Sequence, residues 1–320
     1  MKAPTITEPI LVKPRLDPKP WGGHRLAAFG VPEAANLPIG EAVMTANDVL
    51  VAGGRFDGQS LGSLIMGDPD GLLGNAGVAR AGSPPQFPLL IKLIDAEQQL
   101  SIQVHPDNAM APAGSMGKSE AWYVLAADPG ARVYAGLEQG VSIGDVRTAI
   151  DSGHAFEALV RPHTVTAGDV LYLPAGTIHA LGGGIVVYEI QQPSTITYRL
   201  HDWGRDREMH YVAGLAVLAE GSRPTPQRPP VGRPNARSAP AVQAEHFALE
   251  ILELGPGDSF EIESTDGPQT FTCIGGELNL KSAGGEIDLA VGGTGVLFAN
   301  AGPVQMTSRL GARVLRGSLD

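Results

Sequence analysis

The chain is built from short apolar runs that are separated by glycine and proline. Some runs alternate apolar and polar positions, and others are continuously apolar over a length typical of buried strands. The best strand candidates are LSIQVHP, EAWYVLAA, ARVYAGL, DVLYLPAG, GIVVYEIQQ, ITYRL, FALEILEL, GELNL and GVLFANAG. The chain also contains 42 glycines and 26 prolines, so turns are frequent. The pattern predicts an all-β protein of the sandwich or barrel type.

Helix candidates are few. Apolar residues recur at the three-to-four spacing of an amphipathic helix in SLGSLIMG, SIGDVRTAIDSGHAFEALV and REMHYVAGLAVLAE. We expect these segments to be helical insertions and a connecting helix on a β-framework.

The length of 320 residues suggests two domains of roughly 150 residues each. Residues 221–240, GSRPTPQRPPVGRPNARSAP, are rich in proline and arginine and contain few bulky apolar residues, which is typical of a linker. The sequence therefore predicts a catalytic N-terminal unit at 1–220, a linker at 221–240 and a β-rich C-terminal unit at 241–320.

The two units share a short internal repeat. GDVLYLPAGTIHAL begins at Gly168, and TGVLFANAGPVQMT begins at Thr294. Aligning the two segments places His179 opposite Gln305, whose neutral amide is a weak ligand for a transition metal. Either the match arises by chance, or the chain contains two similar barrels of which only the first binds metal. We expect the second, so the C-terminal unit should be structural.

The amino-acid composition makes some classes of binding partner unfavourable. The chain has 23 Lys and Arg against 34 Asp and Glu, a net charge of −11, which is unfavourable for binding nucleic acid or an anionic membrane. No apolar run approaches the ~20 residues of a spanning helix, and the N-terminus lacks the pattern of a secretory signal. Cys273 is the only cysteine, which excludes an intramolecular disulfide. We expect a cytoplasmic protein without nucleic-acid or membrane partners; the oligomeric state is left open.

Candidate chemistry begins at SIQVHP. Alternate residues of a strand share a face, so Gln103 and His105 point one way while Ile102 and Val104 pack on the other side. Taken singly, a buried histidine or glutamine is explained by hydrogen bonds within the core. The pairing of two polar residues in an apolar strand favours a site, because burying such groups without partners is costly.

A second pair lies in GKSEAWYVL, where Lys118 and Glu120 share a face by the same rule. His179 follows a Pro-Ala-Gly turn in LPAGTIHAL. On their own, Lys118 and Glu120 are explained as solvated surface residues. If the three segments converge in a barrel, they supply nitrogen and oxygen ligands for a divalent ion with room for a water molecule, which is typical of a catalytic metal site.

Longer segments extend these pairs in a fixed order: PKPWGGHRL, IGEAV, FPLLIKLIDAEQQLSIQVHPD, GKSEAWYVL, AGDVLYLPAGTIHAL and ITYRLHDWGR. They resemble the type I mannose-6-phosphate isomerase family in its short bacterial form, from about residue 18 to 205. The resemblance implies two cupin domains, each a jelly-roll β-barrel. It also implies an isomerase that interconverts mannose 6-phosphate and fructose 6-phosphate through an enediolate.

The resemblance further implies roles for individual residues. It assigns one Zn²⁺ per chain to Gln103, His105, Glu120 and His179. Lys118 matches a lysine linked to proton transfer or phosphate binding, Arg199 matches an active-site arginine, and Trp21 lies in a motif near the same cleft. We therefore expect Lys118 and Arg199 to be catalytic, and both of them with Trp21 to bind a small sugar phosphate. Lys118 is the expected base, because a buried lysine beside a dication has a lowered pKa.

The sequence departs from the family pattern at two points. Thr195 stands where the family often has an aspartate, which leaves the group that opens the sugar ring unassigned. IGEAVMTAND lacks the tryptophan that usually follows the Gly-Glu pair.

Two other functions are compatible with the fold. Two histidines and a glutamate would also satisfy the facial triad of an Fe(II) cupin dioxygenase, and a cupin can bind a sugar phosphate without catalysis. The additional ligand Gln103 and the cations Lys118 and Arg199 favour the isomerase over the dioxygenase, and an intact ligand set favours it over a binding protein.

Overall fold

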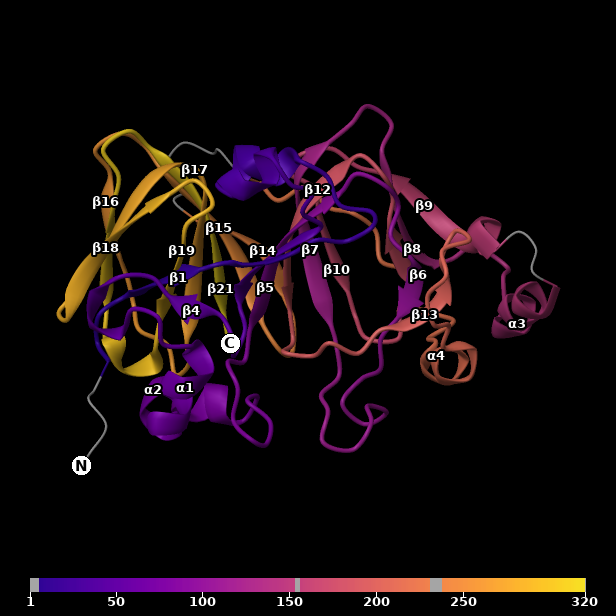
Figure 1. Ribbon diagram of the computed structural model, residues 1–320, viewed down its shortest axis with the longest axis horizontal. Coiled ribbons are helices and arrows are strands. Elements are labelled where there is room, and N and C mark those ends of the chain that lie inside the picture. Colours follow the sequence, from indigo (N-terminus) through magenta and orange to yellow (C-terminus); the bar gives the residue numbers. More distant parts are fainter. Residues whose placement is uncertain (1–5, 153–155, 231–237, 320) are drawn as a thin grey trace.

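The computed structural model describes residues 6–152, 156–230 and 238–319. It is mostly β, with three antiparallel sheets (Figure 1). Two sheets face each other in one half of the molecule, and a ten-stranded sheet forms the other half. The predicted all-β class is confirmed at this level. The strand orders in the described residues are open, so two closed cupin barrels stay a prediction.

The central six-stranded sheet is buried on both faces. Its order is β10 (Val170–Leu173), β7 (Glu120–Ala127), β12 (Ile185–Gln191), β5 (Leu90–Ala96), β3 (Glu41–Thr45) and β2 (Arg15–Asp17). On β7, Trp122 and Val124 pack toward the five-stranded sheet, whereas Ala121 and Tyr123 pack toward the C-terminal half. The two-residue period of the strand thus gives one face to the site and the other to the sheet behind it.

The five-stranded sheet covers the site from the other side. Its order is β13 (Tyr198–His201), β6 (Ile102–Val104), β11 (His179–Leu181), β8 (Arg132–Leu137) and β9 (Val160–Thr164). His179 pairs with Gln103 across β11 and β6. Ile102 and Val104 point away from both residues into an apolar cluster beneath α3 (Ile143–Ser152) and α4 (Tyr211–Val217). This alternation directs polar side chains inward and apolar ones outward, as the sequence predicted.

The ten-stranded sheet combines the two ends of the chain. Its main order is β14 (Ser238–Gln243), β15 (Ala248–Leu254), β21 (Ala312–Ser318), β17 (Gln269–Ser282), β19 (Thr294–Leu297), β1 (Ile10–Lys13) and β4 (Leu50–Val51), with β16 (Ser259–Ile262), β18 (Gly285–Ala290) and β20 (Val304–Thr307) beside it. Leu11 of β1 pairs with Gly295 of β19. In Figure 1 the indigo β1 accordingly lies beside the yellow C-terminal strands. The N-terminal strand therefore completes the C-terminal sheet.

Of the four α-helices in the described residues, three were expected. They are α1 (Leu61–Gly67), α3 and α4, and the remaining one is α2 (Pro69–Val78). The segment expected to be helical after α3 contains the 3₁₀ turn η4 (Phe156–Leu159), and residues 153–155 lie outside the described residues. Helix α2 was missed because PDGLLGNAGV has three glycines, which are poor helix formers. Its Gly74 has a φ of 61°, which interrupts the helix.

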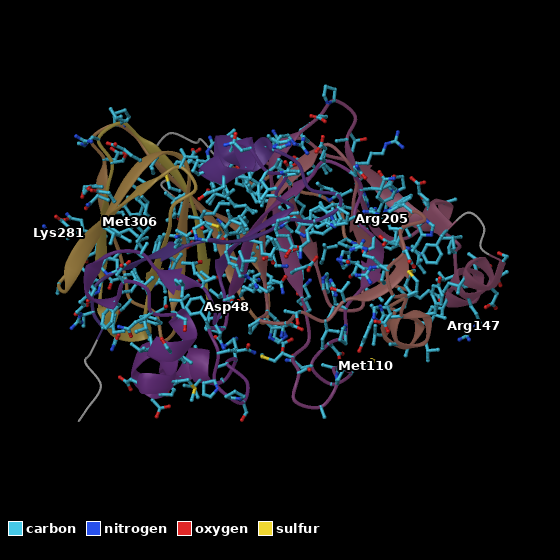
Figure 2. The ribbon with its side chains drawn as sticks, viewed as in Figure 1. Asp48, Met110, Arg147, Arg205, Lys281 and Met306 are labelled. Atoms are coloured by element: carbon cyan, nitrogen blue, oxygen red, sulfur yellow. The ribbon has the colours of Figure 1, made fainter. Side chains whose placement is uncertain are left out.

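Short 3₁₀ turns complete the secondary structure. They are η1 (Arg25–Phe29), η2 (Pro32–Ala35), η3 (Gly54–Phe56), η4 and η5 (Ala299–Ala301). Figure 2 shows the length of the molecule, with Lys281 near the end of β17 at one side and Arg147 of α3 at the other. In the described part of the chain, no helix combines the length and the apolar character needed to cross a bilayer.

The segment after α4 is fixed to the fold, although a linker was expected at 221–240. The hydroxyls of Ser222 and Thr177 lie 2.6 Å apart, and Gln227 forms a bridge with Val170 of β10. Strand β14 begins at Ser238, inside the expected linker. Proline and arginine therefore do not mark a free spacer at 221–230, because hydrogen bonds hold this stretch beside β10. Residues 231–237 lie outside the described residues.

Candidate active site

Three buried titratable side chains meet between the five-stranded and six-stranded sheets. His105 follows β6, Glu120 begins β7 and His179 begins β11. Their ligand atoms lie within 4.8 Å of one another, and no more than 1% of any of the three is exposed. The carboxylate of Glu120 lies between the imidazoles, with one oxygen 3.2 Å from His179 Nε2 and the other 3.5 Å from His105 Nε2. The structure thus brings together three residues that the sequence proposed as metal ligands.

The cluster contains buried polar atoms without hydrogen-bonding partners. Within the described residues, neither ring nitrogen of His105 and neither oxygen of Glu120 forms a hydrogen bond of regular geometry, although Lys118 and the two imidazoles lie 3.1–3.5 Å from the carboxylate. Buried polar atoms in folded proteins are almost always satisfied, so such a group requires an explanation. Two imidazoles and a carboxylate around one point fit a divalent cation such as Zn²⁺, which takes nitrogen and oxygen ligands.

The tautomer of His179 suits metal binding. Nδ1 of His179 lies 2.8 Å from the carbonyl oxygen of Thr177, which can only accept a hydrogen bond. Nδ1 therefore carries the proton, and the lone pair of Nε2 faces the cluster. Such a hydrogen bond from the distal nitrogen to a carbonyl is the usual way in which a ligating histidine is oriented.

Gln103 lies beside the cluster with its amide nitrogen inward. Nε2 of Gln103 is 3.3 Å from His179 Nε2, while its Oε1 accepts a hydrogen bond from the Ser101 hydroxyl at 3.3 Å. Rotating the amide by half a turn exchanges the two atoms. Oε1 then faces the cluster as a ligand, and Nε2 donates to the Ser101 oxygen. Gln103, predicted as a fourth ligand, therefore lies next to the cluster, and its role as a ligand stays a prediction.

The electrostatic environment of the cluster favours the forms of Glu120 and His105 that carry no titratable proton. Burial raises the pKa of Glu120, but the Lys118 ammonium and the two imidazoles outweigh it and hold this pKa well below its usual value. Burial and the charge of Lys118 hold the pKa of His105 well below its usual value. A carboxylate and a neutral imidazole are the forms that bind a metal ion. Lys118 itself is buried, with Nζ 3.1 Å from a Glu120 oxygen.

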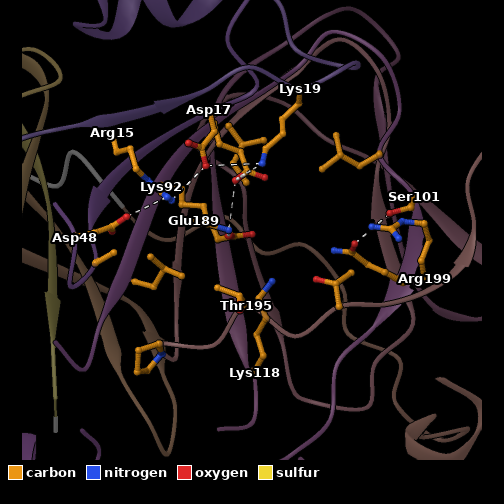
Figure 3. Close-up of a pocket in the computed structure, with 18 of the residues that line it drawn as sticks. Arg15, Asp17, Lys19, Asp48, Lys92, Ser101, Lys118, Glu189, Thr195 and Arg199 are labelled. Carbon is orange, nitrogen blue, oxygen red and sulfur yellow. Dashed lines mark hydrogen bonds and ion pairs between the residues drawn. The ribbon is translucent and has the colours of Figure 1, made fainter. Parts of the chain in front are cut away.

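A cavity of about 550 Å³ opens beside the cluster. Figure 3 shows Lys118 and Thr195 on one side of it, Ser101 and Arg199 on another, and the ion pair of Arg15 with Asp48 at the opposite end. The volume suits a small polar ligand. Each of the predicted substrate-binding residues, Trp21, Lys118 and Arg199, lines this cavity.

Two charged residues in the cavity wall were not predicted from the sequence. Lys92 of β5 and Glu189 of β12 are joined by a 3.1 Å ion pair, and Trp122 Nε1 donates to the other Glu189 oxygen at 3.0 Å. Burial lowers the pKa of Lys92, but the carboxylates of Glu189 and Glu41 outweigh it and raise this pKa. The signal was available, because a single charged residue at an inward position of LIKLIDA or IVVYEIQ is the same pattern that singled out Gln103.

Arg199 faces the cavity without a carboxylate partner. Its Nη1 donates to the carbonyl oxygen of Glu208 at 2.7 Å, and its buried Nε has no partner among the described residues. Asp202, the acid nearest in sequence, instead binds Arg207 in a bidentate pair and also contacts Arg205. Burial and the neighbouring Arg207 lower the pKa of Arg199. Arg199 and Arg207 both line the cavity, so this end of it favours an anion.

Trp21 is held at the cavity by a tight loop. The residue is 3% exposed. Gly22 approaches Gly40 so closely that a Cβ atom on Gly22 would lie 2.4 Å from the Gly40 nitrogen. Nε of Arg25 donates to the buried carboxylate of Asp95 at 2.9 Å, which fixes the end of the loop. The PWGGHR segment thus needs glycine so that its backbone can approach Gly40, and arginine so that the end of the loop is bound to Asp95.

Several other histidines lie away from the cavity lining. His24 bonds to the Ala34 carbonyl, and His201 stacks on Phe156 beneath α3. His154 lies outside the described residues. His201 follows Arg199 closely in the sequence but does not line the cavity.

Comparison with known proteins identifies the family. The type I phosphomannose isomerase catalytic domain matches residues 11–131. Mannose-6-phosphate isomerase of Streptococcus mutans is 36% identical over 228 residues, which cover 68% of this chain and 69% of the relative. The chain belongs to the type I mannose-6-phosphate isomerase family. The family resemblance inferred from sequence is confirmed.

The mannose-6-phosphate isomerase ManA of Bacillus subtilis is 33% identical over 237 residues, covering 68% of this chain and 70% of that protein. The fold of a mannose-6-phosphate isomerase crystal structure from the same organism matches with a TM-score of 0.83 at 27% identity, over 97% of this chain and 99% of the other. The shared fold therefore includes the C-terminal sheet as well as the sheets around the site.

Proposed function

We propose that the chain interconverts mannose 6-phosphate and fructose 6-phosphate. The observation that carries the proposal is the buried His105–Glu120–His179 cluster, whose geometry suits a metal ion, beside a cavity lined by Lys118, Arg199 and Arg207. A site for a metal ion and an anionic sugar is what an aldose–ketose isomerisation of a sugar phosphate needs. Family membership supports the same reaction.

Four residues would hold one Zn²⁺ per chain: Gln103 after rotation of its amide, His105, Glu120 and His179. When bound, such an ion supplies electrophilic stabilisation for the negative oxygens of an enediolate. Glu120 and His105 are prepared for this role, because the lowered pKa of each favours the form without a proton.

The chain's own residues move the proton and hold the substrate. Lys118 is the proposed base, because its Nζ lies 3.1 Å from a Glu120 oxygen at the edge of the cluster and the residue also lines the cavity. Glu189 is a second carboxylate in the cavity wall, fixed by Lys92 and Trp122, and it is the alternative base. Arg199, with Arg207, is proposed to bind the phosphate at the cationic end of the cavity.

Thr195 lines the cavity in place of the aspartate expected from the family pattern. Its hydroxyl cannot act as a base at neutral pH, so we propose that ring opening does not depend on this position. Trp21 packs against the cavity and would exclude water from the bound sugar.

The remainder of the architecture is proposed to follow the family. The five-stranded and six-stranded sheets would form the catalytic cupin domain, and the C-terminal strands a second cupin without metal. In the described part of the chain, His105, Glu120 and His179 are the one group with metal-binding geometry. Gln305, which the sequence aligned with His179, is exposed and donates to the Ser259 hydroxyl at 3.2 Å.

The experiment is a coupled assay on mannose 6-phosphate with purified protein, before and after chelation. Turnover is expected, together with stoichiometric metal, loss of activity on chelation and recovery with Zn²⁺. Absence of turnover in metal-loaded protein would exclude the proposed function. Oxygen uptake with loss of activity under anaerobic conditions would favour the dioxygenase, and tight binding of the sugar phosphate without conversion would favour a binding protein.

A further inference from the structure

The strand that carries Arg199 has an open edge. β13 is the last strand of the five-stranded sheet, so only one of its sides is paired with another strand, β6. Arg199 pairs with Gln103 on that side, and a bulge follows, because the next paired residue is His201 opposite Ile102. The backbone N–H and C=O of a residue on an open edge need partners outside the sheet.

A single residue satisfies both backbone groups of Arg199. The backbone N–H of His210 donates to the Arg199 carbonyl oxygen at 2.8 Å. The backbone N–H of Arg199 points at His210 Nδ1, 3.2 Å away. Two residues of neighbouring antiparallel strands exchange the same pair of bonds. Here an imidazole nitrogen replaces the carbonyl oxygen of the missing strand.

The contact defines the state of the His210 ring. An amide N–H can only donate, so Nδ1 must be the acceptor and the proton lies on Nε2. Nε2 is 3.8 Å from the exposed carboxylate of Glu208, which is compatible with that proton. The Glu208 carbonyl oxygen also accepts from the Arg199 guanidinium. The segment 208–210 therefore holds Arg199 by both its backbone and its side chain.

Helix α4 fixes His210 in turn. His210 is the residue before α4, and its carbonyl oxygen accepts from the Gly214 N–H at 2.8 Å. Gly214 lies so close to β13 that a Cβ atom there would be 2.5 Å from the Leu200 side chain. Glycine at this position therefore lets the start of α4 pack closely against β13, which places His210 next to Arg199.

We infer that His210 is a positioning residue that sets Arg199 for the substrate anion. The inference rests on the proposed function, in which Arg199 binds the phosphate of the sugar. Without the His210 ring nitrogen, the backbone N–H of Arg199 has no acceptor. One of the contacts that hold Arg199 in place is then lost. A displaced arginine weakens anion binding by about tenfold or more, while the proton-transfer groups on the other strands keep their places.

The test compares three substitutions at one position. His210→Asn places an amide oxygen where Nδ1 lies and keeps the acceptor. His210→Gln carries the same amide one methylene further and misplaces it, and His210→Ala removes it. The control is His201→Ala, which removes a ring two residues from Arg199 that has no bond to it. Steady-state kinetics on mannose 6-phosphate are measured together with direct binding of sorbitol 6-phosphate, an analogue without a reactive carbonyl, by calorimetry.

His210→Ala and His210→Gln are expected to raise both KM and the dissociation constant of sorbitol 6-phosphate by about tenfold, with a smaller change in kcat. His210→Asn and His201→Ala should stay within about twofold of the unmodified chain. The inference is overturned if His210→Ala binds the analogue normally, or if His210→Asn is as weak as His210→Gln. If the alanine variant does not fold, the Asn and Gln variants carry the comparison. An unmodified chain that binds the analogue without turnover would refute the isomerase activity alone, because the binding measurements still test His210.

Discussion

At the scale of single residues, the site depends on charges that are buried together. Glu120 is in contact with a lysine and two histidines. Because its side chain is fully buried, water cannot replace a partner that is lost. The sequence predicted this meeting because inward positions of apolar strands carried polar residues. It did not predict the pair of Lys92 with Glu189, since a lysine in a strand is ordinarily assigned to the surface and the partner lies 97 residues away. The two-residue period of a strand shows which face of the sheet a side chain takes. It does not show which other strand lies across from that face.

Replacing Glu120 with glutamine should abolish metal binding. The neutral amide is a poor ligand, and Lys118 loses the carboxylate with which it forms a 3.1 Å ion pair. We expect metal affinity to fall by more than about 100-fold, measured by competition with a chelator. Glu277→Gln is the matched control, because Glu277 pairs with the exposed Arg309 far from the cavity. Normal metal content in the Glu120 variant would contradict the assigned ligand set.

Replacing Arg199 with alanine should affect catalysis far more than stability. The guanidinium has no carboxylate partner of its own, since Asp202 binds Arg207. We expect kcat/KM on mannose 6-phosphate to fall by about 100-fold, with a melting temperature within a few degrees of the unmodified chain. Unchanged turnover with a large loss of melting temperature would show instead that Arg199 is structural. Arg309→Ala, on the exposed surface, provides the comparison.

At the scale of elements, charge pairs join the strands of the cavity wall. Glu41 of β3 contacts Lys92 of β5 and Lys19 of the preceding loop. Burial raises the pKa of Glu41, but the two lysines outweigh it and lower this pKa. The strands themselves were predictable from their apolar runs. Helix α2 was not predictable, because its three glycines disfavour a helix. Contacts with the C-terminal unit stabilise it instead, and the backbone N–H of Asn75 donates to Asp266 there.

The lowered pKa of Glu41 gives a pH-dependent stability. A carboxyl whose folded pKa is below its unfolded value stabilises the fold above the unfolded pKa of about 4.3, and this stabilisation is lost as pH falls through the folded pKa. Glu41→Gln should therefore lower stability by about 1 kcal/mol at pH 7 and by much less at pH 3. Denaturant unfolding at both pH values measures the difference. An equal loss at the two pH values would indicate that the pair contributes through packing rather than charge.

At the scale of the whole molecule, the sheets support one another. The outer face of the six-stranded sheet presents Tyr123, Tyr188 and Ile190 to an apolar cluster that also contains Phe247 and Leu315 of the C-terminal strands. The expected structural role of the C-terminal unit is consistent with this packing. The sequence could not predict the pairing of β1 with β19, since no local pattern marks a partner so distant in the chain.

A chain that ends at Glu220 should lose both stability and activity. It lacks β19, so β1 loses its partner, and the outer face of the six-stranded sheet is exposed to water. Cooperative thermal unfolding and turnover are the measurements. The full-length variant Phe247→Ala gives a milder test, with an expected loss of about 3–5 kcal/mol and an unchanged KM. Full activity and stability of the shortened chain would refute a supporting role for the C-terminal strands.

The pairing of β1 with β19 also has a consequence for the order of events on the ribosome. Residues 10–13 are synthesised long before Gly295, which pairs with Leu11. At ~5–20 residues per second, this strand waits for roughly 15 to 60 s without its neighbour. During that interval its edge is open to other nascent chains. The pairing of β1 with β19 therefore cannot form until Gly295 has been synthesised, and a chaperone that shields the first segment during that interval should raise the yield of folded protein.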